Sequence, residues 1–357
     1  MSELQISLLL IGVVVVLALY AYNGWQQWQY RRKFGTAFQP QHADVLVRPA
    51  QQEEVADHPS EPWLDPKMEQ VLLSEPTQPV VDEICVLLEP GTDYLAMIIP
   101  QKPVGADALA QLWEQRFDFG KSIQVCGRNA TSGQWEKVIA DSRVAYAEFK
   151  LALQLVNRSG AVTENRLLDF RDVVRRIAMS LRANMTLPDV AQAAVCALEL
   201  DKFCADMDQM IGLNIVPSGK RILLGPEIAR VAEQQGLSLQ ADGAFHMLDT
   251  RGHTLFSLGS QDNTPFQHHT LPAMQITALT LLLDVPRVEL PTQRFDQMVA
   301  LAQQLASDLR AVIMDDHQVA LSQAGMLLIR EQIATIETHM LAGNIIPGSS
   351  KARRLFS

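Results

Sequence analysis

The chain has 357 residues, of which 48% are hydrophobic and 20% charged, so it can bury the cores of about two domains and is not disordered throughout. The formal net charge is -10, and the sequence has no basic stripe interleaved with aromatic residues, which argues against a nucleic-acid partner. Four cysteines, Cys85, Cys126, Cys196 and Cys204, form no C-x-x-C motif and no metal-type pairing with histidines. We therefore expect buried free thiols in a reducing compartment.

The N-terminal segment has the pattern of a single transmembrane helix over residues 4–24. No charged side chain lies between Leu4 and Tyr22, and residues 8–19 are apolar on every face of a helix. A helix of about 20 residues spans roughly 30 Å, the thickness of the hydrocarbon core of a bilayer. A cleaved signal peptide is the alternative, but it needs positive charge before the apolar run and a small-residue cleavage site after it, and neither is present.

The residues after this helix predict its orientation. Trp25 and Trp28 are placed for the headgroup region, and the basic run Arg31–Lys33 follows them. By the positive-inside rule, the N-terminus lies in the periplasm and the rest of the chain lies in the cytoplasm. We therefore expect a single-pass protein of the cell inner membrane, with the lipid bilayer as the partner of the N-terminal helix.

Residues 25–80 predict a flexible linker. Prolines recur, apolar periodicity is lost, and glutamines and acidic residues fill the gaps, a composition that does not order itself. A flexible chain of this length has a root-mean-square span of about 40 Å, so the domains beyond it can work clear of the lipid surface. Within the linker, Trp63, Leu64 and the run Val71–Leu73 are apolar enough for a short docking helix.

Residues 209–345 alternate between strand and helix periods and predict a folded domain. Ile211, Leu213 and Ile215 alternate with less apolar residues, as in a strand with one buried face. The other predicted elements are a helix over 226–235, a hairpin over 244–258, a strand over 276–285, a helix over 295–309, a last hairpin over 312–321 and a helix over 329–340. The predicted fold class is α+β, a two-layer split β-α-β sandwich with an antiparallel sheet.

One face of this sheet is a candidate binding surface. Helices that follow strands in this order can pack on one side of the sheet and leave the other face open to a ligand. The residues predicted to point to the open side are Met210, Gly212, Asn214, Ala244, His246, Leu255, Gly259, Thr280 and Leu282. An ordinary solvated face is the alternative, because scattered exposed apolar residues need no ligand to explain them.

Four short stretches here resemble the C-terminal domain of the ZipA family, membrane-anchored partners of the tubulin-like division protein FtsZ. They are Gly212–Val216, Leu255–Leu258, Leu281–Pro286 and Ile313–Asp316, and they follow the family's order. The resemblance spans residues 210–341, and the anchor and linker upstream repeat the family's layout. It implies a shallow apolar groove that takes up the C-terminal tail of FtsZ and so tethers the division ring to the membrane. The residues expected to contact this peptide are Met210, Gly212, Asn214, Ala244, His246, Thr280 and Leu282.

Three positions depart from the family pattern. Where family members present large apolar side chains, this sequence has Gly212, Asp242 and Gln261. Burial of apolar area, at about 25 cal/mol per Å², drives binding in such a groove. Smaller and more polar residues therefore imply weaker binding or a different peptide partner.

Residues 81–208 predict a degenerate second copy of the same domain. A shift of 128 positions lays residues 146–183 on residues 274–311 without a gap. The helical stripe Leu167, Phe170, Val174, Ile177 and Leu181 then falls on Phe295, Met298, Ala302, Leu305 and Leu309. Earlier elements match in order, with a strand over 84–88, a helix over 107–114 and a strand pair over 123–127 and 135–138. We expect this copy to lack the last hairpin. Convergent amphipathic helices are the alternative, since such stripes are common.

No combination of residues predicts catalysis. His268 and His269 are adjacent and would point opposite ways in a strand, and turn hydrogen bonding explains residues 315–317 and Asp249. We therefore expect a non-enzymatic protein with no cofactor, no metal and no small-molecule substrate. The alternative is a membrane-anchored enzyme or regulator whose site lies between two related domains. An enzyme should have a deep pocket with titratable groups, whereas an adaptor should have an apolar stripe across the sheet.

The last residues, 346–357, predict a solvated basic tail. Lys351, Arg353 and Arg354 carry its charge. A contact with acidic protein or lipid is the alternative for these residues.

Overall fold

The computed structural model of the chain describes residues 85, 88–219, 221–315 and 319–357. The predicted transmembrane helix over 4–24, the linker over 25–80 and the docking helix within it lie outside the described residues. In the described ranges, every helix is too short or too polar to cross a membrane.

The N-terminal lobe, defined as residues 85 and 88–208, is built on an antiparallel sheet with the strand order β3-β2-β4-β1-β7. Its elements are β1 (Asp93–Ile99), η1 (Ala106–Leu109), α3 (Ala110–Glu114), β2 (Ile123–Asn129), β3 (Trp135–Lys137), β4 (Tyr146–Gln154), β5 (Val156–Asn157), β6 (Gly160–Ala161), α4 (Glu164–Ser180), β7 (Asn184–Thr186) and α5 (Val190–Met207). The apolar stripe of α4 is buried, and Phe170 meets the rings of Tyr94 and Phe119 edge to face. The periodicity of this segment therefore places its helix on the core side of the sheet.

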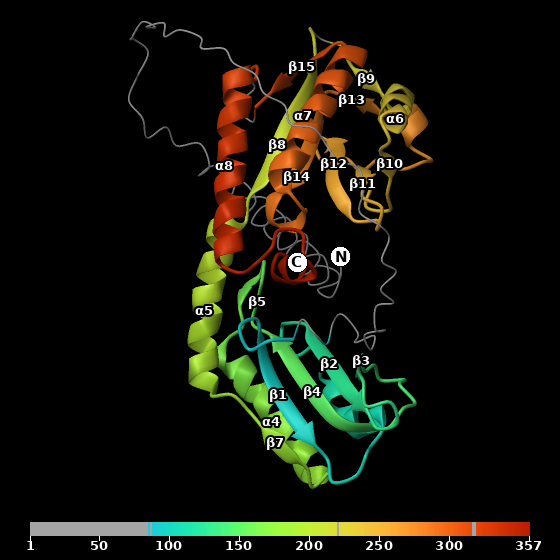
Figure 1. Cartoon of the computed structure of the whole chain (residues 1–357). Coiled ribbons are helices and arrows are strands. Elements are labelled where there is room, and N and C mark those ends of the chain that lie inside the picture. The colour runs from blue at the N-terminus through green and yellow to red at the C-terminus, as the bar shows by residue number, and fades with distance from the viewer. Residues whose placement is uncertain (1–84, 86–87, 220, 316–318) are drawn as a thin grey trace, which may run out of the picture. The chain divides into compact units, whose positions relative to one another are not determined.

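The C-terminal lobe, defined as residues 209–345, has a six-stranded antiparallel sheet with the order β10-β11-β12-β14-β8-β15 (Figure 1). Its elements are β8 (Met210–Pro217), β9 (Leu223–Leu224), α6 (Gly225–Gln234), β10 (Ser238–Leu239), β11 (Phe245–Leu248), β12 (Thr254–Ser260), η2 (Leu271–Ala273), β13 (Gln275–Ile276), β14 (Leu279–Asp284), η3 (Val285–Arg287), α7 (Pro291–Asp308), β15 (Ala311–Met314) and α8 (Gln323–Ala342). Buried leucines and aromatic residues of β8, β12 and β14 pack with α7 in the core. The predicted α+β class with antiparallel sheets is confirmed.

Three predicted elements differ from the structure. The strand expected over 84–88 is absent from the described residues of that stretch, and the first strand is β1, which begins at Asp93 after a turn at Pro90. The strand expected over 276–285 is divided, because Ile276 pairs with Leu223 in a separate small sheet and β14 begins at Leu279. The described residues in the second arm of the last predicted hairpin form no strand of their own, but they pair with β15 through the Met314–Ala320 bridge and through hydrogen bonds from Asp315 N to Val319 O and from Leu321 N to Ile313 O, so the hairpin is confirmed in outline.

The two lobes share a detail at the ends of corresponding helices. Arg182 after α4 and Arg310 after α7 both have left-handed backbones, with φ of 48° and 50°, and lie 128 positions apart. In each case the preceding leucine closes the helix, since Leu181 N donates to Ile177 O and Leu309 N donates to Leu305 O. In each lobe, the chain then enters an edge strand, β7 or β15, that pairs with the first strand of that lobe. A left-handed residue other than glycine is uncommon after a helix, so its recurrence at this spacing is specific.

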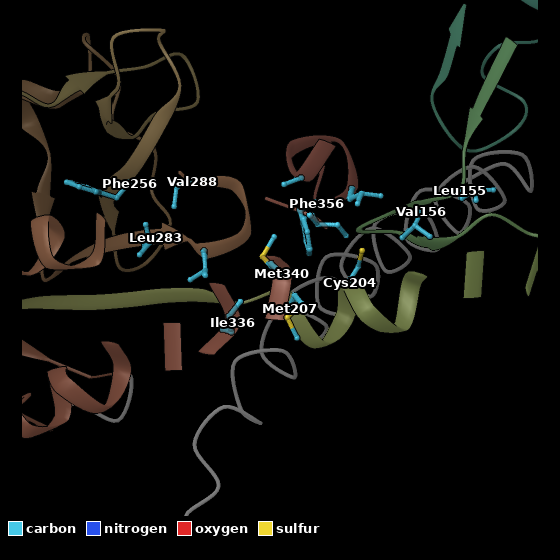
Figure 2. Packing of buried hydrophobic residues seen from close by; sticks show 14 of the residues in the cluster. Leu155, Val156, Cys204, Met207, Phe256, Leu283, Val288, Ile336, Met340 and Phe356 are labelled. Carbon is cyan, nitrogen blue, oxygen red and sulfur yellow. The ribbon is translucent and has the colours of Figure 1, made fainter. Parts of the chain in front are cut away.

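The residues expected to form a solvated basic tail are ordered and buried instead. Helix α9 (Ser350–Leu355) begins at a Ser349 cap, and Ala352, Leu355 and Phe356 are almost fully buried. Figure 2 shows Phe356 with Met340, Met207 and Cys204 within a core that includes residues of both lobes. The Arg354 guanidinium pairs with Asp93, and its carbonyl accepts from Gln154 Nε2 at 2.8 Å. The apolar residues on either side of the arginines, Ala352 before them and Leu355 and Phe356 after them, thus determine the position of this segment.

Two cysteines expected to be free thiols form a disulfide. Cys85 and Cys126 are bonded, with Cα atoms 5.8 Å apart, whereas Cys196 and Cys204 are free. Cys85 and Leu88 pack on Cys126 and Ala152, which point away from α4 on the second face of the N-terminal sheet. The sequence gives no motif for this pairing, because 41 residues separate the two cysteines and only the fold brings them together.

Candidate functional site

The candidate site is the face of the C-terminal sheet that points away from α7. Leu213, Ile215 and Leu281 are buried on the core side, so the residues between them in the same strands point to the opposite side. We define the open face as these alternate residues, which are Met210, Gly212 and Asn214 in β8, Thr280, Leu282 and Asp284 in β14, and Leu255, Ser257 and Gly259 in β12. Asn214 is only 3% exposed, whereas the other residues of this face are partly exposed. A side chain added at Gly259 would meet no atom within 4 Å. The face is therefore open at that position.

Register divides the open face into a row that holds Leu282, which we name the apolar row for that side chain although it includes Ser257, and a polar row. Gly212, Leu282 and Ser257 lie side by side on neighbouring strands, and Asn214, Thr280 and Gly259 form the adjacent row. Thr280 Oγ1 donates to Asn214 Oδ1 at 2.7 Å, and Asn214 Nδ2 donates to Asp315 O at 3.2 Å. Five of the predicted site residues, Met210, Gly212, Asn214, Thr280 and Leu282, are thus brought together, with a hydrogen-bonded pair in their midst.

Of the other two predicted site residues, His246 in β11 pairs in register with Ser257 and so continues the row of Gly212, Leu282 and Ser257, whereas Ala244 lies before β11. His246 in β11 has its Nδ1 2.8 Å from Thr254 Oγ1 and its Nε2 2.9 Å from an oxygen of Asp242, so its own hairpin holds the ring. Ala244 lies in the turn before β11, where its N–H donates to Asp242 Oδ1. Asp242, one of the positions that depart from the family pattern, therefore serves as a turn acceptor.

A groove between α7 and α8 is the larger described cavity, with a volume of about 530 Å³. Phe295, Val299, Met326 and Leu327 supply apolar lining, and the Asp296–Arg330 ion pair lies at 2.8 Å. No set of three or more His, Cys, Asp or Glu residues in the described ranges is placed to hold a metal ion. The groove gathers no group of titratable side chains of the kind that acid-base catalysis uses.

A second, smaller cavity of about 130 Å³ lies where β12 begins, and we name it the arginine crevice. Its lining includes Arg251, His253, Leu255, Arg287, Arg294 and Arg353, together with Asp249 and Glu289. Arg251 pairs with Glu289, and His253 Nδ1 lies 3.2 Å from Asp249 Oδ2. Backbone hydrogen bonding from His253, with help from Arg251, lowers the pKa of Asp249 below its usual 3.8. Sequence reasoning missed this crevice because its arginines come from a hairpin, a 3-10 helix and two helices far apart in the chain.

The C-terminal lobe matches a known family model, described as "ZipA, C-terminal FtsZ-binding domain", over residues 209–332. The chain is also similar to proteins named cell division protein ZipA. The relative from Xanthomonas axonopodis pv. citri (strain 306) is 26% identical over 133 residues, which cover 36% of this chain and 54% of that protein. The relative from Stutzerimonas stutzeri (strain A1501) is 25% identical over 146 residues, which cover 38% of this chain and 52% of that protein.

These matches cover only part of each protein. The chain spans about half the length of the curated relatives it matches, as the shares of 54% and 52% indicate. The matched residues include β8, β12 and β14, the three central strands that carry the open face. The match over residues 209–332 and the similarity to these relatives therefore support a relation between the C-terminal lobe and the ZipA family.

Proposed function

We propose that this chain is a non-enzymatic cell-division adaptor of the inner membrane that binds the C-terminal tail of FtsZ on the open face. The family description supports the choice of partner, because it names FtsZ binding for the matched domain. The observation that carries the proposal is the row Gly212–Leu282–Ser257, in which one leucine lies between two small residues on a half-exposed sheet face.

This row suits an apolar side chain of an extended peptide. Neighbouring strands lie about 4.8 Å apart, so Gly212 and Ser257 leave room on both sides of Leu282 for a large side chain to pack against it. Burial of such a side chain contributes about 2 kcal/mol at roughly 25 cal/mol per Å². Met210 and Leu255, two residues before Gly212 and Ser257 in their strands, add apolar area at one end of the open face, beside the carboxylate of Asp284, which pairs with Met210 in register and is bound by Arg158.

Titration of a fluorescent FtsZ tail peptide against the full-length chain in detergent micelles tests the proposal. We expect saturable binding that Leu282→Asp weakens by about tenfold or more, because the change places a charge where apolar area is buried. Leu327→Asp is the matched control, since Leu327 is an exposed leucine of α8 at 55% accessibility and lies off the sheet. No saturable binding at high micromolar peptide, or equal losses in the two variants, would refute FtsZ as the ligand of this face.

A second candidate keeps the adaptor role but changes the peptide. The hydrogen-bonded pair Thr280–Asn214 favours it, because the middle of an apolar groove is an unusual place for two polar side chains. A partner that supplies its own polar side chain or backbone group at that row would be preferred over a wholly apolar tail. Competition between the FtsZ peptide and a library of extended peptides separates the two candidates.

We also propose how the chain reaches the membrane. The apolar run over 4–24 acts as the anchor and residues 25–80 as the tether, with the N-terminus in the periplasm and both lobes in the cytoplasm. Accessibility of single cysteines introduced before and after the apolar run to a membrane-impermeant thiol reagent tests this orientation. Labelling from outside the inner membrane at a position after Lys33 would reverse it.

We propose that the N-terminal lobe is a degenerate copy of the C-terminal lobe and that it does not bind a peptide. The matching edge strands and the left-handed arginines at 182 and 310 support a common origin. Its equivalent sheet face carries Cys85 and Leu88 packed on Cys126 and Ala152. We therefore assign the peptide to the C-terminal lobe alone, which predicts one bound tail per chain in a calorimetric titration.

A further inference from the structure

The arginine crevice holds more positive than negative charge. Its two carboxylates are already engaged, Glu289 by Arg251 and Asp249 by His253. Arg294 and Arg353 have no carboxylate within 4 Å in the described part of the chain. Arg287 lies 3.9 Å from Asp284, whose two oxygens accept closer hydrogen bonds from Arg158. Two arginines, Arg294 and Arg353, thus line one small cavity without a carboxylate partner in the described residues, and Arg287 has only the long ion pair with Asp284, so the cavity attracts an anion.

The size of the crevice limits what can enter it. A volume of about 130 Å³ has room for a carboxylate with a few waters, since each water takes about 30 Å³ in the liquid, but it has no room for a nucleotide. A ligand that puts only its anionic group into the crevice must place the rest of itself on the neighbouring surface.

The neighbouring surface is the open face, because Leu255 belongs to both. Leu255 lines the crevice and lies two residues before Ser257 in β12, about 7 Å along the strand from the row of Leu282. An extended chain that packs beside Leu282 would pass the Asp284–Arg158 ion pair and reach the crevice within a few residues.

We propose that the arginine crevice binds the free C-terminal carboxylate of the peptide that lies on the open face. This inference rests on the proposed function, since it takes the occupant of that face to be the end of a polypeptide. Arg353, Arg294 and Arg287 each carry a planar guanidinium, whose N–H donors can pair with a carboxylate through two parallel hydrogen bonds. The crevice then fixes the direction and register of the tail, which the apolar row alone leaves undetermined.

A cycle of two changes tests the proposal. The FtsZ tail peptide is prepared with a free carboxyl terminus and with a C-terminal amide, and each form is titrated against the full-length chain and against its Arg353→Met variant. We expect amidation to weaken binding to the unaltered chain by about tenfold and to have no effect on the variant, because both changes remove the same ion pair. Raised salt should weaken the free acid more than the amide.

Controls keep the outcomes distinct. Arg230→Met removes an exposed arginine of α6 that binds only Gln234 among the described residues, and it should leave the tenfold ratio intact. Arg287→Met, at a side chain 43% exposed, provides a second variant if Arg353→Met fails to melt cooperatively. Equal binding of acid and amide by the unaltered chain would overturn the carboxylate site and leave the proposed function standing. Absence of binding by both forms would overturn the proposed function itself.

Discussion

Arg158 donates to both carboxylate oxygens of Asp284, 126 residues further along the chain, at 2.9 and 2.7 Å. The same guanidinium donates to Asp208 at 2.7 Å, so one arginine from the β5–β6 turn joins the end of α5 to the end of β14. Burial disfavours the charged guanidinium, but its hydrogen bonds with Asp284 and Asp208 raise the pKa of Arg158 overall. Burial also raises the pKa of Asp284, an effect that Arg158 opposes. Burial of two carboxylates costs free energy unless a cation pairs with them, and Arg158 supplies that cation.

Arg158→Met should therefore destabilise the folded chain. It leaves Asp208 and Asp284 close together and largely buried without their cation, a loss we place at about 2 kcal/mol after allowing for partial exposure. Arg330→Met is the control, because Arg330 pairs with Asp296 in an exposed position and should cost no more than about 0.5 kcal/mol. Urea unfolding of the two variants measures the difference. Equal midpoints would mean that the Arg158 pairs contribute no more than a surface ion pair.

Gly259→Val should strengthen binding of an apolar peptide tail. The new side chain meets open space and adds about 40 Å² of apolar surface beside Thr280, which corresponds to about 1 kcal/mol or roughly fivefold in Kd. Gly91→Val, at another glycine with nothing within 4 Å, is the control away from the sheet. Fluorescence anisotropy with the tail peptide measures both. A weaker complex would mean that the peptide backbone rests directly on Gly259.

Asp249→Ala should lower the melting temperature in a pH-dependent manner. Asp249 Oδ1 accepts from the backbone N–H groups of Arg251 and His253, each at 2.8 Å, and its pKa is lowered. A lowered pKa contributes stability above the usual value of 3.8, and that stability is lost as the pH falls through the lower folded value. The deficit of the variant should thus be full at pH 7 and shrink below pH 3.8. Asp249→Asn, which keeps an acceptor without titrating, should show a smaller deficit at pH 7.

The Cys85–Cys126 disulfide should stabilise the fold, and its redox state should report the compartment in which the lobes lie. It closes a loop of 41 residues, so Cys126→Ser should lower the free energy of unfolding of the oxidised protein by up to about 4 kcal/mol. In the cytoplasm, where we propose the lobes reside, both thiols should be reduced. Acid-quenched cells, alkylated in denaturant before and after reduction, report the state of each cysteine by mass spectrometry.

The two free cysteines are the internal reference for that measurement. Cys196 and Cys204 are free thiols and should react with the alkylating reagent added before reduction in any compartment. If Cys85 and Cys126 in freshly quenched cells react only with the alkylating reagent added after reduction, the two cysteines are disulfide-bonded in the cell. The lobes then lie in an oxidising compartment, and the proposed orientation of the anchor is wrong.

Much of the C-terminal lobe was predictable because its signals are local. Alternation at Ile211, Leu213 and Ile215 predicted β8, and the helical stripe from Phe295 predicted α7. The open face followed from the same alternation, which assigned Gly212 and Leu282 to one side. The family resemblance could be recognised because it lies in these same strands.

The remaining features depend on residues distant in sequence. Cys85 and Leu88 belong to an apolar run, but both pack on a sheet face, and the first described strand, β1, begins only at Asp93 after the turn at Pro90. Phe356 follows a basic run, and only the space between the lobes explains its burial. The arginine crevice and the Arg158 pairs join elements whose adjacency has no local signature.

The Cys85–Cys126 bond also determines where mechanical load enters the folded chain. A pull on the residues before Cys85 passes covalently into β2, the second strand of its sheet, and reaches the C-terminal lobe only through α5, the Arg158 pairs and α9. Tension between the N-terminal segment and a ligand on the open face would thus load these connections in series with the strands around Leu282. With the disulfide reduced, the same force would pass along the backbone to Leu88 and β1 instead of into β2. The redox state of the two cysteines thus determines which strand of the N-terminal lobe receives the force.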